Sequence, residues 1–425
     1  MNNKCKSHLR NLAGKYTEYA FGDTMIQRKE KWRLHNRMQE KTFPFHIEDN
    51  GSFFRDISPS LQCEDAECRA LEARLLHALI AYEKIDDDRI IPDRFVVDWV
   101  TTLTGYCDEL VLTHANDGYG GTLGYKSNKP IKDIDADFHK LKRQTLTLDR
   151  ERTDRRAELA RDVFKGLLPV VVGRPSSSYS NGITSKAVHL MGMQELYIQM
   201  ATNPEAVHRL LTFFAEDNLA LGQWEEEQEL LTLNNDGNQG YCSGSSQFSD
   251  EIPGREMEEG EPILSTDRYG YLESQEAVGI SPDMFAEFLM PHFLKLANKF
   301  KLMKFGCCEP VHDLMPHLHK LNGLRKVSVT PWCDQEKLAA ICNKDIIWSR
   351  KPVPLKLCGT TFEPDDFRLH LEETLKIGKD YFIEFIFRDT CRLTGQMEQR
   401  IAHACDIIRD VTNRPEGRRQ NTMNA

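Results

Sequence analysis

Residues 302–312 read LMKFGCCEPVH, in which a short apolar segment runs directly into a glycine, two cysteines and a glutamate. Short buried strands that alternate with helices are typical of βα units, whose strands run parallel in one sheet. This alternation continues to the end of the chain, with stretches of helical character between the apolar segments. The further apolar segments are 326–329 (KVSV), 346–348 (IIW) and 381–387 (YFIEFIF).

The same alternation extends upstream to about residue 91. A helix is predicted over 154–167, and Asn203-Pro204 predicts the start of another, because asparagine caps a helix and proline suits its first turn. No Gly-rich dinucleotide or phosphate motif is present, so a (β/α)₈ TIM barrel in the α/β class is favoured over a doubly wound fold. The upstream predicted strands are 95–100 (FVVDWV), 169–173 (PVVVG) and 230–233 (LLTL).

The first 90 residues are charged and mostly helical in pattern. Apolar side chains recur at helical spacing over 65–83, and 43–47 (FPFHI) suits a short strand. We therefore predict a helical extension over residues 1–90 that packs on a barrel of residues 91–412. Residues 413–425 are polar and are predicted to be a disordered tail.

Composition excludes several classes of protein. The chain has 425 residues, of which 40% are hydrophobic and 28% charged, with a net charge of −10. These values rule out a disordered or collagen-like chain and argue against a broad nucleic-acid-binding surface. No apolar run approaches the roughly 20 residues that span a bilayer. Because the first residues lack a secretory signal, we expect a cytoplasmic protein whose 12 cysteines are mostly free thiols.

The strongest chemical signal is Cys307-Cys308-Glu309, directly after a predicted strand. In a barrel, functional side chains follow strands at the C-terminal face. Thiolates and carboxylates are good zinc ligands, and a catalytic zinc has three protein ligands and an open position. Cys391 follows another predicted strand and is a further candidate. The competing interpretation is that these cysteines are small buried hydrophobes.

Other predicted strand ends carry polar or aromatic residues. Asn234 and Asp236 follow 230–233, where Asp236 is a candidate general base or hydroxyl-binding group, or a turn cap. Trp332 suits an apolar substrate wall. Arg350 and Arg388 suit an anionic group, as does Lys351, which follows Arg350. The alternative interpretation is that these residues belong to turns or carry charges that solvent hydrates.

Three segments together resemble the uroporphyrinogen decarboxylase superfamily, over roughly residues 170–410. They are 272–285 (LESQEAVGISPDMF), the strand that runs into Cys307-Cys308-Glu309, and the region of Cys391. The resemblance is closest to the zinc- and corrinoid-dependent methyltransferases and to bacterial members without an assigned activity. It implies a (β/α)₈ barrel.

The resemblance also implies a metal site. Methyltransferases of this type hold zinc through a His-x-Cys at one strand end and a cysteine after a later strand. Cys308 aligns with the first cysteine, Cys391 resembles the second, and Gly306 stands in place of the histidine. Glu309 or Cys307 is then the candidate third ligand.

The function that this resemblance implies is transfer of a methyl group from a small methylated substrate to a corrinoid protein, with Zn²⁺ as cofactor. Asp236 and Glu309 are the candidate catalytic residues. The candidate substrate-binding residues are Trp332, Arg350, Asn234 and Arg388.

Two alternatives remain. One is a metal-free decarboxylase or other lyase, in which Arg350, Lys351 and Arg388 bind carboxylates and Asp236 protonates a carbanion. The other is a ligand-binding barrel without catalysis. We expect no nucleic-acid or membrane partner, and a homodimer stays open.

Overall fold

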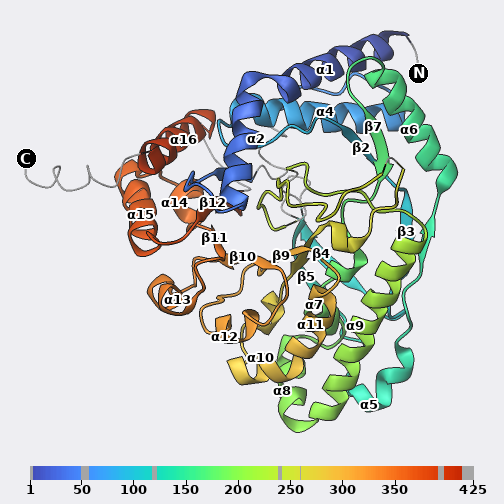
Figure 1. Cartoon of the computed structure of the whole chain (residues 1–425). Helices are drawn as coiled ribbons and strands as arrows, with labels where there is room; N and C mark the ends of the chain where they lie inside the picture. Colours follow the sequence, from blue (N-terminus) through green and yellow to red (C-terminus); the bar gives the residue numbers. More distant parts are fainter. Residues whose placement is uncertain are drawn as a thin grey trace, which may run out of the picture.

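A computed structural model describes the conformation of residues 3–48, 57–116, 122–237, 242–258, 260–390 and 397–413. Its centre is a curled sheet of six parallel strands in the order β1-β12-β11-β10-β9-β8. Figure 1 shows β12, β11, β10 and β9 crossing the middle of the molecule, with α13 and α15 on its outer side. The strands are β1 (Phe45–Ile47), β8 (Tyr269–Leu272), β9 (Leu302–Phe305), β10 (Leu324–Val329), β11 (Ile347–Arg350) and β12 (Ile383–Phe387).

A second parallel pair joins β2 (Phe95–Asp98) to β7 (Val170–Gly173). Beyond β7, the predicted strand at 230–233 is present only as an isolated parallel bridge between Arg174 and Leu231. The α/β class and the parallel strands are therefore confirmed. Within the described ranges, however, the pairings form a half-barrel and a separate pair, and they do not establish a closed eight-stranded ring.

The N-terminal helices pack together on one side of the sheet. They are α1 (Asn3–Phe21), α2 (Asp23–Asn36) and α4 (Ala66–Lys84), and α6 (Arg150–Phe164) joins them. Apolar residues from these helices and from β2 form a core of their own, and a disulfide joins Cys5 to Cys63. The nine other cysteines among the described residues form no disulfide, which agrees with the expectation that most of the 12 are free thiols. The first 90 residues also supply β1, which pairs with β12 in the central sheet.

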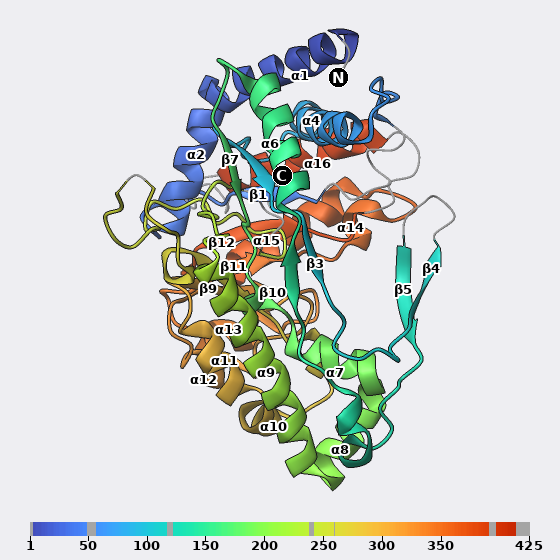
Figure 2. The same cartoon turned by 90° about the vertical axis from the view of Figure 1, so that its right-hand side faces the viewer.

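An insertion between β2 and β7 was not predicted from the sequence. It contains two antiparallel pairs, β3 with β6 and β4 with β5. Figure 2 shows the β4–β5 hairpin standing apart from the central sheet. The elements are β3 (Thr101–Leu103), β4 (Leu112–Asn116), β5 (Thr122–Ser127), α5 (Ile134–Asp137), η1 (Phe138–Lys140) and β6 (Leu146–Leu148).

Most of the remaining helices follow the strands of the sheet. Helix α9 begins at Pro204, as the sequence predicts, but the side chain of Asn203 makes no capping hydrogen bond. Ser281 caps α10 through its side chain. Among the described residues, no helix is both long and apolar enough to cross a membrane. The predicted tail, 413–425, lies outside the described residues except for Asn413.

The remaining elements are η2 (Ser178–Ser180), α7 (Ile183–Met191), α8 (Met193–Thr202), α9 (Pro204–Glu227), η4 (Ser265–Asp267), η5 (Gln275–Ala277), α10 (Pro282–Phe288), α11 (Met290–Ala297), α12 (Met315–Leu318), α13 (Gln335–Ile341), α14 (Leu355–Cys358), α15 (Pro364–Ile377) and α16 (Met397–Asn413).

Candidate active site

The carboxyl ends of four parallel strands bring reactive and charged side chains to one edge of the sheet. Glu273 follows β8, Cys307 follows β9, Lys351 follows β11 and Arg388 follows β12. Ser243, from the segment that begins at residue 242, contacts three of them. The edge on which the sequence predicted a site is therefore the edge on which these groups meet.

The sulfur of Cys307 lies at the centre of this group. Its Sγ is 3.6 Å from Sγ of Cys308, 3.5 Å from Oγ of Ser243 and 4.0 Å from a guanidinium nitrogen of Arg388. The hydrogen bond from Cys308 is the largest cause of a lowered pKa at Cys307. Burial alone would raise this pKa, but the bond from Cys308 and the charge of Lys351 together outweigh burial. Cys307 is therefore a thiolate at neutral pH, whereas the pKa of Cys308 is raised because that thiol donates to Cys307.

Ser243 connects the thiolate to two cations. Its Oγ accepts a hydrogen bond from Nζ of Lys351 at 2.7 Å and from Arg388 at 2.6 Å. A hydroxyl has two acceptor lone pairs and one proton, so with both lone pairs occupied the proton is directed to Cys307. Ser243 also has a positive φ of 50°, a conformation that a non-glycine residue adopts at a cost. The backbone is thus held in an unfavourable conformation where its hydroxyl meets the sulfur.

Lys351 is buried, and besides Ser243 it donates a hydrogen bond to the main-chain oxygen of Cys307. We predict that Lys351→Met raises the midpoint pH of Cys307 alkylation by about one to three units, because a neighbouring opposite charge lowers a pKa by that amount. The measurement is iodoacetamide labelling across pH in chelator-treated protein, read by peptide mass. Lys304→Met is the matched control, since Lys304 is also buried but bonds to Cys242 and Ser349. An equal shift in both variants would contradict a specific role for Lys351.

Glu309 holds two strand ends together. Its carboxylate is buried and accepts main-chain hydrogen bonds from Ser274 at 2.7 Å and from Cys307 at 2.8 Å. Burial raises its pKa despite these bonds. The adjacent Gly306 has φ 100°, where a side chain is strained, and an added Cβ would meet Ser328 at 3.2 Å. This backbone conformation favours glycine at the position where the family pattern has histidine.

An acidic group that sequence reasoning missed lies beside the thiolate. Burial first, and then the charges of Glu276 and Glu309, raise the pKa of Glu273 to about 8. Glu273 therefore carries its proton at neutral pH. The hydroxyl of Tyr271, on β8, is a further hydrogen-bond donor to the sulfur of Cys307. The available sequence signal was the segment 272–285, which carries the family resemblance but gives no measure of burial.

The remaining predicted residues fall in different places. Trp332 is 74% exposed. Arg350 is buried and donates hydrogen bonds to the main-chain oxygens of Val329 and Thr330, at 3.2 and 2.7 Å. The side chain of Asn234 bonds to the backbone of Tyr269.

Asp236 and Cys391 were also predicted as site residues. Asp236 is buried and lines a pocket described below. Cys391 lies outside the described residues.

The proposed zinc ligands fit the structure in part. Two thiolates on a tetrahedral zinc, with Zn–S bonds of about 2.3 Å, lie about 3.8 Å apart. The 3.6 Å between the sulfurs of Cys307 and Cys308 is close to this value. Within the described ranges no three or more histidine, cysteine or acidic side chains gather as a metal site. Both oxygens of Glu309, a further candidate ligand, accept hydrogen bonds from main-chain N–H groups. The remaining candidate, Cys391, lies outside the described residues.

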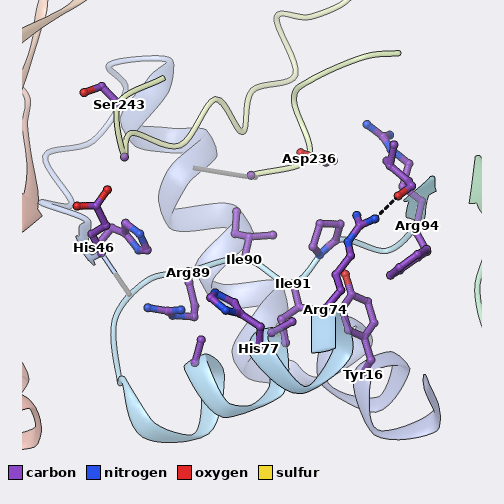
Figure 3. A pocket seen from close by; sticks show the side chains of 18 of the residues that line it. Tyr16, His46, Arg74, His77, Arg89, Ile90, Ile91, Arg94, Asp236 and Ser243 are labelled. Atoms are coloured by element: carbon purple, nitrogen blue, oxygen red, sulfur yellow. Dashed lines mark hydrogen bonds between the residues drawn. The ribbon is translucent and has the colours of Figure 1, made fainter. Parts of the chain in front are cut away.

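A pocket of about 430 Å³ adjoins the residues that contact Cys307, and Figure 3 shows side chains that line it. Ser243 and Arg388 belong both to its wall and to the contacts of the thiolate. Four arginines line the pocket, against two carboxylates among the described residues, and apolar side chains lie between them. The lining includes Arg74, Arg89, Arg94, Arg388, Glu48, Asp236, Ile90 and Ile91.

Comparisons with known proteins give distant likenesses to solved structures only. No family model matches the chain, and no curated protein matches it. A solved structure described as a methyltransferase from Methanosarcina mazei is similar over 90% of this chain and 98% of that chain, with a TM-score of 0.49 and 13% sequence identity. At that level the likeness carries no argument about activity.

Proposed function

We propose that the protein is a methyltransferase whose reaction centre is the Cys307–Cys308 pair. The observation that supports this most is the Cys307 thiolate, which Lys351, Ser243 and Arg388 surround at one edge of a parallel sheet. The sequence resemblance at Cys307-Cys308-Glu309 points to the same chemistry. The proposal includes a complete (β/α)₈ barrel over residues 91–412, whose eight strands would be β2, β7, the segment around Leu231 and β8 to β12, with β1 of the N-terminal extension paired to β12.

The proposal also includes Zn²⁺, held by Cys307, Cys308 and Cys391. The metal would supply Lewis-acid activation of the heteroatom that carries the methyl group. In this proposal the methyl acceptor is a corrinoid bound to a partner protein.

The chain's own residues would manage charge and protons around that step. Lys351 and Arg388 would offset the negative charge of the sulfurs, and Ser243 would orient the Cys307 sulfur. In this transfer the bond between the donor heteroatom and the methyl carbon would break, and the methyl carbon would pass to the corrinoid acceptor, which would supply the electron pair of the new bond. The heteroatom keeps the old bonding pair and takes up a proton, which Glu273 would donate because it is protonated at neutral pH.

Zinc content tests this proposal. We expect about one zinc per chain in protein purified without chelator, and loss of most of it in Cys308→Ser, because serine is not a thiolate ligand. Elemental analysis measures both. Cys342→Ser is the control, since Cys342 lies at the opposite ends of the strands and donates to the main-chain oxygen of Asn343. Wild-type protein that is metal-free under these conditions would contradict the zinc site.

The lyase is a second candidate because of the arginine-lined pocket. Arg74, Arg94 and Arg388 line it together with Asp236, which suits a carboxylated substrate and a proton donor. Release of carbon dioxide from a bound acid that persists in both Cys307→Ser and Cys308→Ser would favour the lyase. Loss of all turnover in both variants would favour methyl transfer.

A further inference from the structure

The pocket beside Cys307 has two unlike ends. Figure 3 shows Arg74, Arg94 and Tyr16 on one side, and His46, Arg89 and Ser243 on the other, with Ile90 and Ile91 between them. Only the second end contacts the Cys307 thiolate, through Ser243 and Arg388. A ligand that spans the pocket would therefore place one end at the reacting sulfurs and the other at Arg74 and Arg94.

The arginines at the thiolate end already have acidic partners. Arg89 binds both oxygens of Asp87, at 2.7 and 2.9 Å. Arg388 pairs with Glu48 at 2.9 Å. Their charges are therefore largely offset within the protein, and a second anion at this end gains little from them.

The arginines at the far end differ. Arg74 donates to the main-chain oxygen of Val96 at 2.6 Å, and Arg94 to that of Leu233 at 3.1 Å. In the part of the chain that the structure describes, neither arginine forms an ion pair with a carboxylate. A guanidinium has five N–H donors in a planar fork that matches a carboxylate, so each keeps donors for a ligand.

The middle of the pocket is apolar, because Ile90 and Ile91 line it (Figure 3). Asp236 also lies in the wall and couples electrostatically to Tyr16 at the Arg74–Arg94 end, so it offsets part of the charge of the two guanidinium groups there, and the remaining positive charge attracts an anionic group. The pocket therefore suits a molecule with one charged end and an apolar body.

We propose that this pocket binds a methylated carboxylic acid, with its carboxylate at Arg74 and Arg94, its apolar body along Ile90 and Ile91, and its methylated end toward Ser243 and the cysteine pair. This inference names the substrate class of the proposed methyltransferase and rests on that function.

Binding of 4-methoxybenzoate, compared with its neutral analogue 4-methoxybenzamide, tests the inference. We expect isothermal titration to show that wild-type protein binds the acid at least about tenfold more tightly than the amide. Arg94→Gln and Arg74→Gln should each weaken the acid about tenfold and leave the amide unchanged. Arg143→Gln is the matched control, because Arg143 pairs with Glu216 on the surface and does not line the pocket.

Equal affinity for acid and amide, no binding of either, or no effect of both pocket variants would overturn the inference. Cys307→Ser separates this failure from failure of the proposed function, because it removes the thiolate and leaves the far end of the pocket intact. Charge-selective binding without any methyl transfer in wild type would support the pocket and count against the methyltransferase. Methyl transfer that does not distinguish charged from neutral donors would support the methyltransferase and count against the proposed role of the pocket.

Discussion

Cys307→Ser is expected to lower the rate of methyl transfer by at least about a thousandfold. The thiolate of Cys307 is stabilised by Cys308, Lys351 and Ser243. A serine hydroxyl is not ionised at neutral pH, so the variant keeps the size of the side chain and loses both the negative charge and the sulfur donor. The measurement is conversion of free cob(I)alamin to methylcobalamin, followed by visible absorbance, with methylated carboxylic acids as donors.

The control for this experiment is Cys342→Ser, which should transfer methyl groups at the wild-type rate. Cys342 is buried and lies where α13 ends, ahead of β11, at the opposite ends of the strands from Cys307. A Cys307→Ser rate within tenfold of wild type would show that the thiolate takes no part in the reaction. Such a result would leave the arginine-lined pocket as the main functional feature and would favour the lyase.

The strand-end rule found part of this site from sequence alone. It selected Cys307 and Arg388, which the structure brings within 4.0 Å of each other. It also selected Arg350, the last residue of β11, whose Nε instead donates to Thr374 on α15. Side chains alternate between the two faces of a strand, so the neighbouring Ser349 faces the interior and binds Lys304. Sequence position at a strand end does not by itself tell which face a side chain takes.

Other features needed the folded chain. Ser243 reaches Cys307 because a segment 64 residues earlier returns over the sheet, and nothing local in the sequence predicts that contact. Glu273 keeps its proton because burial and two other carboxylates raise its pKa, which depends on tertiary packing. The strands β3 and β6 are three residues each and lack a clear apolar alternation, so they gave no periodic signal. By contrast, the long apolar strand β12 and the start of helix α9 at Pro204 were predicted correctly.

The second large effect is expected for stability. Glu384→Gln should lower the free energy of unfolding by about 3–5 kcal/mol at neutral pH, because it leaves a buried cation without its carboxylate. Nζ of Lys326 lies 2.7 Å from Oε2 of Glu384, and both side chains are fully buried. Lys304 is buried nearby and donates only to the main-chain oxygen of Cys242 and to Ser349 among its described partners. Denaturant unfolding followed by circular dichroism measures the change.

The stability that Glu384 contributes depends on pH. Burial alone would raise the pKa of Glu384, but Lys326, Lys304 and His35 outweigh it and lower the pKa to about 2. A carboxyl whose folded pKa lies below its unfolded value, about 4.3, stabilises the protein fully above that value. The stability difference between wild type and Glu384→Gln should therefore be constant above about pH 5 and shrink as the pH falls from 4.3 toward 2.

A double variant separates the loss of the ion pair from the loss of packing. Adding Lys326→Met to Glu384→Gln removes the unpaired cation, so most of the lost stability should return. Lys326 also binds Oγ of Ser245 at 3.0 Å and the main-chain oxygen of Ser246 at 2.9 Å, in the segment that presents Ser243 to the thiolate. We therefore expect the double variant to recover its stability. Its Cys307 alkylation should still differ from that of the wild type, because the hydrogen bonds from Lys326 to this segment are lost. If the double variant is no more stable than Glu384→Gln alone, the single variant loses stability through packing. An unpaired charge on Lys326 would then not be the cause.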